Sequence, residues 1–106
     1  MKASLLTKLE TLTDRHEEVS ALLGDSEVIT DQNRFRDLSR EYSELEAVVN
    51  CYNRYTQVQS DLADAQLMLE DDDPEVRDMA REEIESGGAT LAELEVELQT
   101  LLLPRD

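Results

Sequence analysis

The chain has 106 residues, the size of one ordinary domain. It carries 26 Asp and Glu residues against 10 Lys and Arg residues, a formal net charge of −16. Because such a chain repels phosphate groups, bare nucleic acid, including DNA, is a disfavoured partner. Apolar residues make up 40% of the chain but aromatic residues only 4%, with 3 Gly and 2 Pro. This composition argues against a β-sandwich and favours helices.

The single cysteine and the absence of long apolar runs indicate the compartment. Cys51 has no second cysteine with which to form an internal disulfide, which is typical of a reducing environment. No apolar run approaches the ~20 residues that a membrane-spanning helix needs. The N-terminus also lacks the sustained apolar segment of a secretion signal. We therefore expect a cytoplasmic protein that does not contact a membrane.

The first block of the chain has apolar residues at steps of three and four, which predicts a helix over about residues 3–23. Its apolar positions are Leu5, Leu9, Leu12, Val19 and Leu23, and His16 fills the remaining position of the seam. Gly24 follows directly and is a good C′ residue for closing a helix. Residues 25–32 then predict a short connection, with Thr30 or Asp31 capping the next helix.

The second and third blocks predict two longer helices, over about residues 31–70 and 74–102. The second block has apolar positions at Phe35, Leu38, Tyr42, Leu45, Val48 or Val49, Tyr52, Tyr55, Val58, Leu62, Ala65 and Leu69. The third has Val76, Ala80, Ile84, Leu91, Leu94, Leu98 and Leu101. Asp73 and Pro74 are a typical N-cap and first helical residue, and Pro104 ends the pattern. The short connection between these helices requires them to lie antiparallel.

These elements predict an all-α fold, an elongated three-helix bundle with a long antiparallel coiled-coil hairpin, as a single domain over residues 1–106. One pair of residues conflicts with the pattern. Gly87 and Gly88 lie inside the third helix, where each glycine costs about 1 kcal/mol relative to alanine. We therefore expect a kink, a weak point or a short break there.

No residue pattern indicates catalysis, a cofactor or a metal. The only histidine, His16, lies in the helical seam without an obvious orienting partner, so packing is the favoured role. Cys51 is interpreted as a small packed side chain for the same reason. The run Asp71-Asp72-Asp73 lacks the alternating spacing and central glycine of a calcium loop, and helix termination explains it better. Metal binding by these residues is not predicted.

Two charged segments are candidates for contact with a partner, although the pattern does not assign partner-binding residues. Arg34, Arg36 and Arg40 are the only concentrated basic residues, and we favour a solvated face on which they pair with Asp37, Glu41 and Glu44. The run from Glu70 to Glu75 is an exposed acidic bend between the two long helices.

The whole chain resembles the N-terminal domain of bacterial class I peptide chain release factors of the type that reads UAG and UAA. The segments that carry the resemblance are Lys8-Leu9-Glu10, Glu17-Glu18-Val19, Leu22-Leu23-Gly24-Asp25, Phe35 to Leu45, Gln66 to Leu69, Asp73 to Ala80, and Leu94 to Asp106. Gly87-Gly88-Ala89 departs from the family, which usually has charged helix formers there. It is also not the family's catalytic Gly-Gly-Gln.

The resemblance implies a non-catalytic part of a release factor that acts in stop-codon-dependent termination. In the family this domain docks at the GTPase-associated region of the large ribosomal subunit, near the stalk-base protein, while codon reading and peptidyl-tRNA hydrolysis belong to other domains. The fragment itself is expected to be a monomer or a weak homodimer. An alternative from another class is a free-standing acidic helical adaptor or coiled-coil dimerisation module, which would share the same leucine periodicity. A hydrolase acting by itself is a third, less favoured reading.

Overall fold

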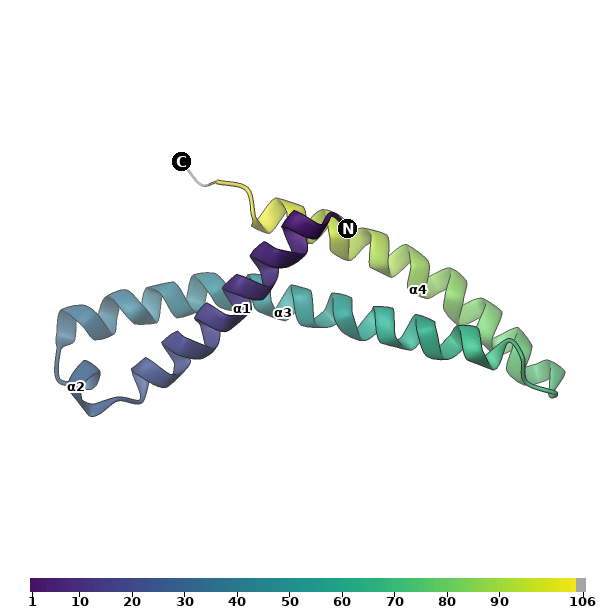
Figure 1. Ribbon diagram of the computed structural model, residues 1–106, viewed down its shortest axis with the longest axis horizontal. Helices are drawn as coiled ribbons and strands as arrows, with labels where there is room; N and C mark the ends of the chain where they lie inside the picture. Colours follow the sequence, from purple (N-terminus) through teal and green to yellow (C-terminus); the bar gives the residue numbers. More distant parts are fainter. Residues whose placement is uncertain (105–106) are drawn as a thin grey trace. The chain divides into compact units, whose positions relative to one another are not determined.

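The computed structural model describes residues 1–104, which form four α-helices and no strand (Figure 1). The helices are α1 (Ala3–Leu23), α2 (Ser26–Ile29), α3 (Gln32–Met68) and α4 (Pro74–Leu101). The all-α prediction is confirmed, and the three long helices begin and end within two residues of the predicted bounds. None of these helices is both long enough and apolar enough to cross a lipid bilayer.

The chain divides within α3 into two compact units, Met1–Asn50 and Cys51–Asp106. The first unit contains α1, α2 and the beginning of α3, and the second contains the rest of α3 together with α4. The assignment of residues 1–106 to a single domain stays a prediction.

In the first unit, α1 and α2 pack on the beginning of α3 around a small apolar core. The buried core residues are Val19, Val28, Leu38 and Leu45, and the partly buried residues packed against them are Leu12, Leu22, Leu23 and Tyr42. Phe35, predicted to begin the seam of the long helix, instead remains 39% exposed. Phe35 lies in the first turn of α3, shortly after α2 ends at Ile29, which is itself 53% exposed.

The segment between α1 and α3 is more ordered than the short connection that the sequence predicts. The Asp25 carboxylate accepts a hydrogen bond from the Glu27 amide at 2.9 Å, and this cap begins the single turn of α2. That turn places Val28 in the core with no exposed surface. Gly24 caps the end of α1, as predicted, with a φ of −92°, which is outside the left-handed region. The next helix begins so soon that α1 ends on tightened backbone bonds instead, with the Gly24 amide donating to the Ala21 carbonyl at 3.1 Å.

In the second unit, α3 and α4 form the predicted antiparallel hairpin. Near its open end, the Cys51 thiol lies 3.9 Å from the Leu94 carbonyl oxygen. Closer to the bend, Leu62 packs against Gly87. Residue numbers therefore rise along one helix as they fall along the other. The buried residues of this unit are Cys51, Tyr55, Ala65, Ala80, Leu94 and Leu98.

The two adjacent glycines do not interrupt α4, so the expected break is wrong. A Cβ atom placed on Gly87 would lie 2.7 Å from Leu62 Cδ2, whereas one placed on Gly88 would have nothing within 4 Å. Gly87 therefore gives the Leu62 side chain room in the hairpin, and packing of α4 on α3 offsets the low helix propensity of glycine.

Asp73 is the N-cap of α4, and we expect its replacement by alanine to weaken the second unit. Its carboxylate accepts a hydrogen bond from the Glu75 amide at 2.9 Å. Loss of this cap should cost about 1 kcal/mol of unfolding free energy, measured by urea denaturation. Asp72→Ala is the matched control, because the carboxylate of Asp72 caps no helix. An equal loss in both variants would contradict the capping role.

Candidate functional site

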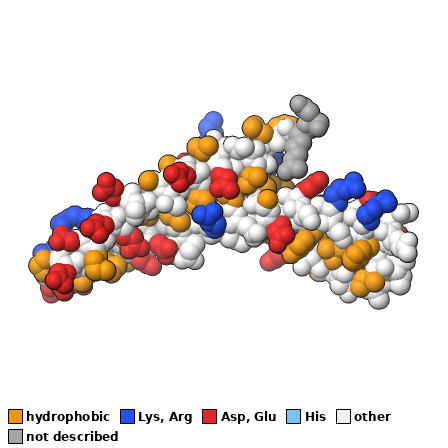
Figure 2. Space-filling view, turned by 180° about the vertical axis from the view of Figure 1, so that it is seen from behind, with side chains coloured by type: hydrophobic (Ala, Val, Ile, Leu, Met, Phe, Trp, Pro, Cys, Tyr) orange, Lys and Arg blue, Asp and Glu red, His pale blue; other side chains and the backbone are white. Residues whose placement is uncertain are grey.

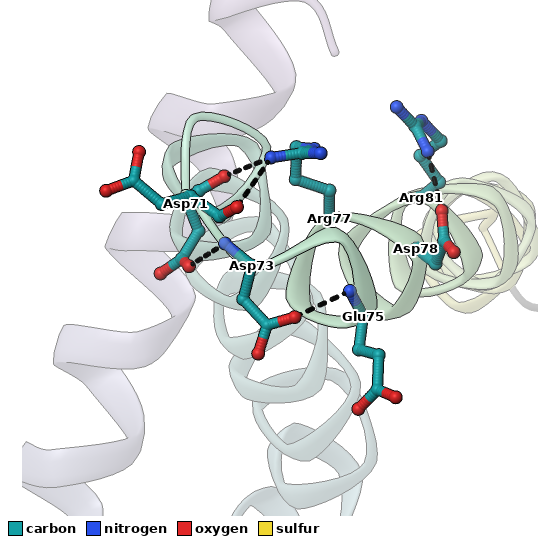
Figure 3. A network of polar contacts seen from close by, with 7 residues as sticks. Asp71, Asp73, Glu75, Arg77, Asp78 and Arg81 are labelled. Atoms are coloured by element: carbon teal, nitrogen blue, oxygen red, sulfur yellow. Dashed lines mark hydrogen bonds and ion pairs between the residues drawn. The ribbon is translucent and has the colours of Figure 1, made fainter.

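The acidic bend, residues 70–75, is a turn whose hydrogen bonds come from the end of α3, from within the bend and from the start of α4 (Figure 3). After α3 ends, the amides of Glu70 and Asp71 donate to the carbonyls three residues earlier, at 3.2 and 3.1 Å. The Asp71 carboxylate then accepts from the Asp73 amide at 2.8 Å. Two of the bend's carboxylates, on Asp71 and Asp73, are therefore used to shape the backbone.

Arg77 ties the bend to the first turns of α4. Its Nη1 atom donates to the carbonyl oxygens of Asp71 and Asp72, at 2.7 and 3.1 Å (Figure 3). The arginine charge is thus directed at backbone oxygens rather than at a carboxylate. One helical turn further along, Arg81 pairs with Asp78 at 2.7 Å. The bend remains a fixed, exposed anionic surface in which the carboxylates of Glu70, Asp72 and Glu75 face solvent.

The basic candidate, Arg34, Arg36 and Arg40, does not form one surface. At roughly 100° per residue, Arg36 and Arg40 share a face of α3, whereas Arg34 lies roughly 160° around the helix from Arg36. All three side chains are exposed. Of the predicted pairs, the structure contains Arg36 with Asp37 at 3.6 Å, between two side chains that are 65% and 68% exposed. Such a pair contributes little to stability.

A polar clasp that the sequence reasoning did not predict joins α1 to α3 in the first unit. The Arg15 guanidinium donates from Nε and Nη2 to the two carboxylate oxygens of Glu41, at 2.6 and 2.8 Å. The two hydrogen bonds and the charge of Arg15 lower the pKa of Glu41. In return, Glu41 and then Glu18 raise the pKa of Arg15. Glu41 was expected to pair with the basic residues of its own helix, but it forms its ion pair with Arg15 of α1.

His16 lies next to this clasp and packs, as the sequence predicts. Its ring stacks on Tyr42 with 4.6 Å between the ring centroids and 22° between the planes. The His16 Nε2 atom is buried and has no hydrogen-bond partner among the described residues. Arg15 and Glu41 directly precede His16 and Tyr42 in sequence. Opposite charges directly before two seam residues that face each other, His16 and Tyr42, are the sequence signal that could have predicted the clasp.

Cys51 and Tyr55 lie inside the hairpin of the second unit, in packing roles. Burial raises the pKa of the Cys51 thiol, with a smaller contribution from Glu97, so the thiol is not activated. Burial also raises the pKa of Tyr55, whose hydroxyl donates to Glu95 at 3.1 Å and accepts from Gln59 at 3.2 Å. The predicted packed role of Cys51 is confirmed by its 4% exposure. Within residues 1–104, no three His, Cys, Asp or Glu side chains are placed to hold a metal ion.

Comparison with known protein families identifies the family of this chain. Residues 12–106 match the PCRF domain. The chain belongs to the PCRF domain family. This is a domain of peptide chain release factors, so the chain is a release-factor domain that takes part in translation termination and interacts with the ribosome.

The helix clasp of this PCRF domain predicts an acid-sensitive stability. Because the folded-state pKa of Glu41 is lowered, the pair stabilises the fold above the unfolded-state pKa of about 4.5. That stabilisation is lost as the pH falls from about 4.5 through the lower folded-state value. The melting temperature of Glu41→Gln should therefore lie below that of the parent chain at pH 7, with the gap closing at acidic pH.

Glu44→Gln serves as the control for this pH dependence, since the Glu44 side chain is exposed and pairs with no described residue. Its melting temperature should follow that of the parent chain throughout the titration. A gap for Glu41→Gln that stays constant with pH would mean that the clasp does not act through the charge of Glu41.

Proposed function

We propose that this PCRF domain is the N-terminal ribosome-docking domain of a bacterial release factor of the type that reads UAG and UAA. Its docking place would be the GTPase-associated region of the large subunit, beside the ribosomal protein at the stalk base. The observation that carries the proposal is the PCRF match over residues 12–106. The resemblance of the segments from Phe35 to Leu45 and from Asp73 to Ala80 supports the choice of the UAG/UAA-reading type.

Charge supports a docking place on ribosomal protein rather than on bare rRNA. The chain has a net charge of −16, whereas the proteins of the ribosome that contact rRNA are rich in basic side chains. The acidic bend is the better candidate for this contact, because its carboxylates are exposed and its backbone is held in one conformation. The separated arginines of α3 are the weaker candidate.

The proposed role is positional and not catalytic. Peptidyl-tRNA hydrolysis and stop-codon reading would be carried out by other parts of a release factor, in the cytoplasm where translation takes place. We expect the 106-residue chain to release no peptide from ribosomes that hold peptidyl-tRNA and a UAG or UAA codon in the decoding site. Measurable release above the rate without factor would overturn this assignment.

Docking is tested by sedimenting the labelled chain with bacterial 70S ribosomes and with separated large and small subunits. The expected result is saturable binding to 70S ribosomes and large subunits, and none to small subunits. Addition of a full-length UAG/UAA-reading factor should displace the chain. Binding confined to small subunits, or binding that such a factor does not displace, would contradict the proposal.

Solution mass separates this proposal from the dimerisation-module alternative. A docking domain whose helices bury their apolar stripes on one another should be a monomer at micromolar concentration. A dimerisation module should remain associated on dilution, because its seam would be covered by a second copy. Analytical ultracentrifugation distinguishes the two outcomes.

A further inference from the structure

The α3–α4 hairpin has two flanks of different composition. Residues three or four apart share a face of a helix, so each buried stripe is bordered by two exposed stripes. We define the acidic flank by one bordering stripe from each helix. It comprises Gln57, Asp61, Asp64 and Met68 of α3, and Glu75, Met79, Glu82, Ser86, Thr90, Glu93 and Glu97 of α4. The opposite flank comprises Gln59, Ala63 and Gln66 of α3, and Arg77, Arg81, Glu85, Gly88, Ala92, Glu95 and Gln99 of α4.

Contacts across the hairpin fix which stripes lie on the same side. The Tyr55 hydroxyl bonds both Gln59 of α3 and Glu95 of α4, which places those two on one side. The charges of Arg54 and Glu97 both act on the Cys51 thiol. Arg54 is one turn before Gln57 in the same stripe of α3, so this stripe and that of Glu97 border the other side.

From Gln57 of α3 to Glu97 of α4 the acidic flank carries six carboxylates and no Lys or Arg, and Arg54, one turn before Gln57, is the cation at its end. The six are Asp61, Asp64, Glu75, Glu82, Glu93 and Glu97, and all six side chains are exposed. None of them forms an ion pair with another described residue; Asp61 accepts a hydrogen bond from Gln57 at 2.9 Å. By contrast, the opposite flank has two arginines and two glutamates. The negative charge of the hairpin is therefore gathered on one side, where Arg54 at the end of the flank is the neighbouring cation.

Two methionines interrupt the acidic flank near the bend. Met68, the last residue of α3, is 41% exposed, and Met79, in the second turn of α4, is 65% exposed. Their stripes border the same side of the hairpin and their positions face each other across it. Figure 2 shows apolar side chains at the surface of the hairpin among acidic ones. Exposed methionines adapt their shape to an inserted side chain, and carboxylates around them select for positive charge.

We propose that the acidic flank is the face with which the hairpin docks on a basic protein surface, with Met68 and Met79 covering an apolar side chain of that partner. The proposal rests on the proposed function, since it names the side of the domain that meets the ribosome and the chemistry of the surface that it meets. The proposed contact surface is the whole acidic flank and not the bend alone. In the bend, the carboxylates of Asp71 and Asp73 accept backbone hydrogen bonds, and no exposed methionine lies between them.

Charge complementarity selects this occupant over two others. RNA phosphates would meet six carboxylates with a single cation, Arg54, at the end of their row, which is a net repulsion. A second copy of the chain that docked flank to flank would bring the same six carboxylates against their own kind. A basic protein surface removes the apolar area of the methionines from water and neutralises the surrounding carboxylates at the same time.

The test compares variants of the labelled 106-residue chain in binding to large ribosomal subunits and to protein-free 23S rRNA. One double variant, Asp64→Asn with Glu82→Gln, removes two negative charges beside the methionines. A second double variant, Met68→Ala with Met79→Ala, removes the apolar centre of the flank. The matched controls are Glu46→Gln/Glu85→Gln and Leu67→Ala/Val96→Ala, which change exposed residues outside the flank in the same way. We expect each flank variant to weaken binding to large subunits about tenfold or more, with each control within about twofold of the parent.

Each outcome is decisive. Parent-like binding by the flank variants, or equal loss by the controls, overturns the flank assignment while leaving the proposed function intact. Failure of the parent chain to bind large subunits overturns both. Tight binding to protein-free rRNA, or a flank variant that dimerises more weakly than the parent, overturns the flank assignment in favour of RNA or of a second copy. Far-ultraviolet circular dichroism of every variant confirms that the helices are retained.

Discussion

Replacing Leu98 by alanine should lower the unfolding free energy of this release-factor domain by about 3 kcal/mol. Leu98 lies in the last turn of α4 as a fully buried side chain with 0% exposure. Truncation to alanine loses the transfer free energy of the removed carbons and leaves a cavity, because helices of a small fold close up only in part. Chemical denaturation followed by circular dichroism measures the change.

Val96→Ala is the control for this prediction, two residues earlier in the same helix. Its side chain is 63% exposed, so we expect a change within about 0.5 kcal/mol. A loss of less than about 1 kcal/mol for Leu98→Ala would show that Leu98 is not a core residue of the folded protein in solution.

Alanine substitutions at the two neighbouring glycines, Gly87 and Gly88, should change the unfolding free energy in opposite directions. Gly87→Ala places a Cβ atom 2.7 Å from Leu62 Cδ2 and 3.2 Å from Leu62 Cγ. Overpacking of this kind costs about 1–3 kcal/mol, while alanine recovers about 1 kcal/mol of helix propensity. Because the Cγ atom cannot move without its whole side chain, we expect a net loss of about 1 kcal/mol.

Gly88→Ala is the matched variant, since its Cβ atom would meet nothing within 4 Å. Only the propensity gain applies there, so we expect the domain to become more stable by about 1 kcal/mol. The two variants should therefore differ by about 2 kcal/mol in unfolding free energy, although their compositions are identical. Equal stabilisation by both would show that Leu62 moves aside without cost. Adding Leu62→Ala to both backgrounds isolates the coupling between positions 62 and 87.

The long helices could be predicted from the sequence because their signals are local. Apolar residues recur every three or four residues through α3, and the Asp73-Pro74 cap that begins α4 needs only its own backbone. The sequence also predicted the packed roles of Cys51 and His16, because each occupies a seam position in an uninterrupted helical pattern.

The sequence predictions were wrong at positions where the local structure depends on a contact with a neighbouring helix. Local propensity predicts a break at Gly87, but Leu62 of the facing helix occupies the space that a side chain would take, and α4 continues. Glu41 has basic residues at helical spacing on its own helix, yet it pairs with Arg15 of α1. Residues 25–32 predict a short connection, but Asp25 caps the helical turn α2, which buries Val28 against the neighbouring helices.

By itself, then, the sequence determined that this protein is helical, acidic and folded back at residues 70–75, because periodicity, charge count and capping are properties of the local chain. The tertiary structure alone decided which carboxylates are paired and which are exposed together. That question depends on the side of each helix that its neighbour covers. The α3–α4 hairpin covers one stripe of each helix and leaves six carboxylates and two methionines along one flank, and this juxtaposition exists only once the two helices have been packed against each other.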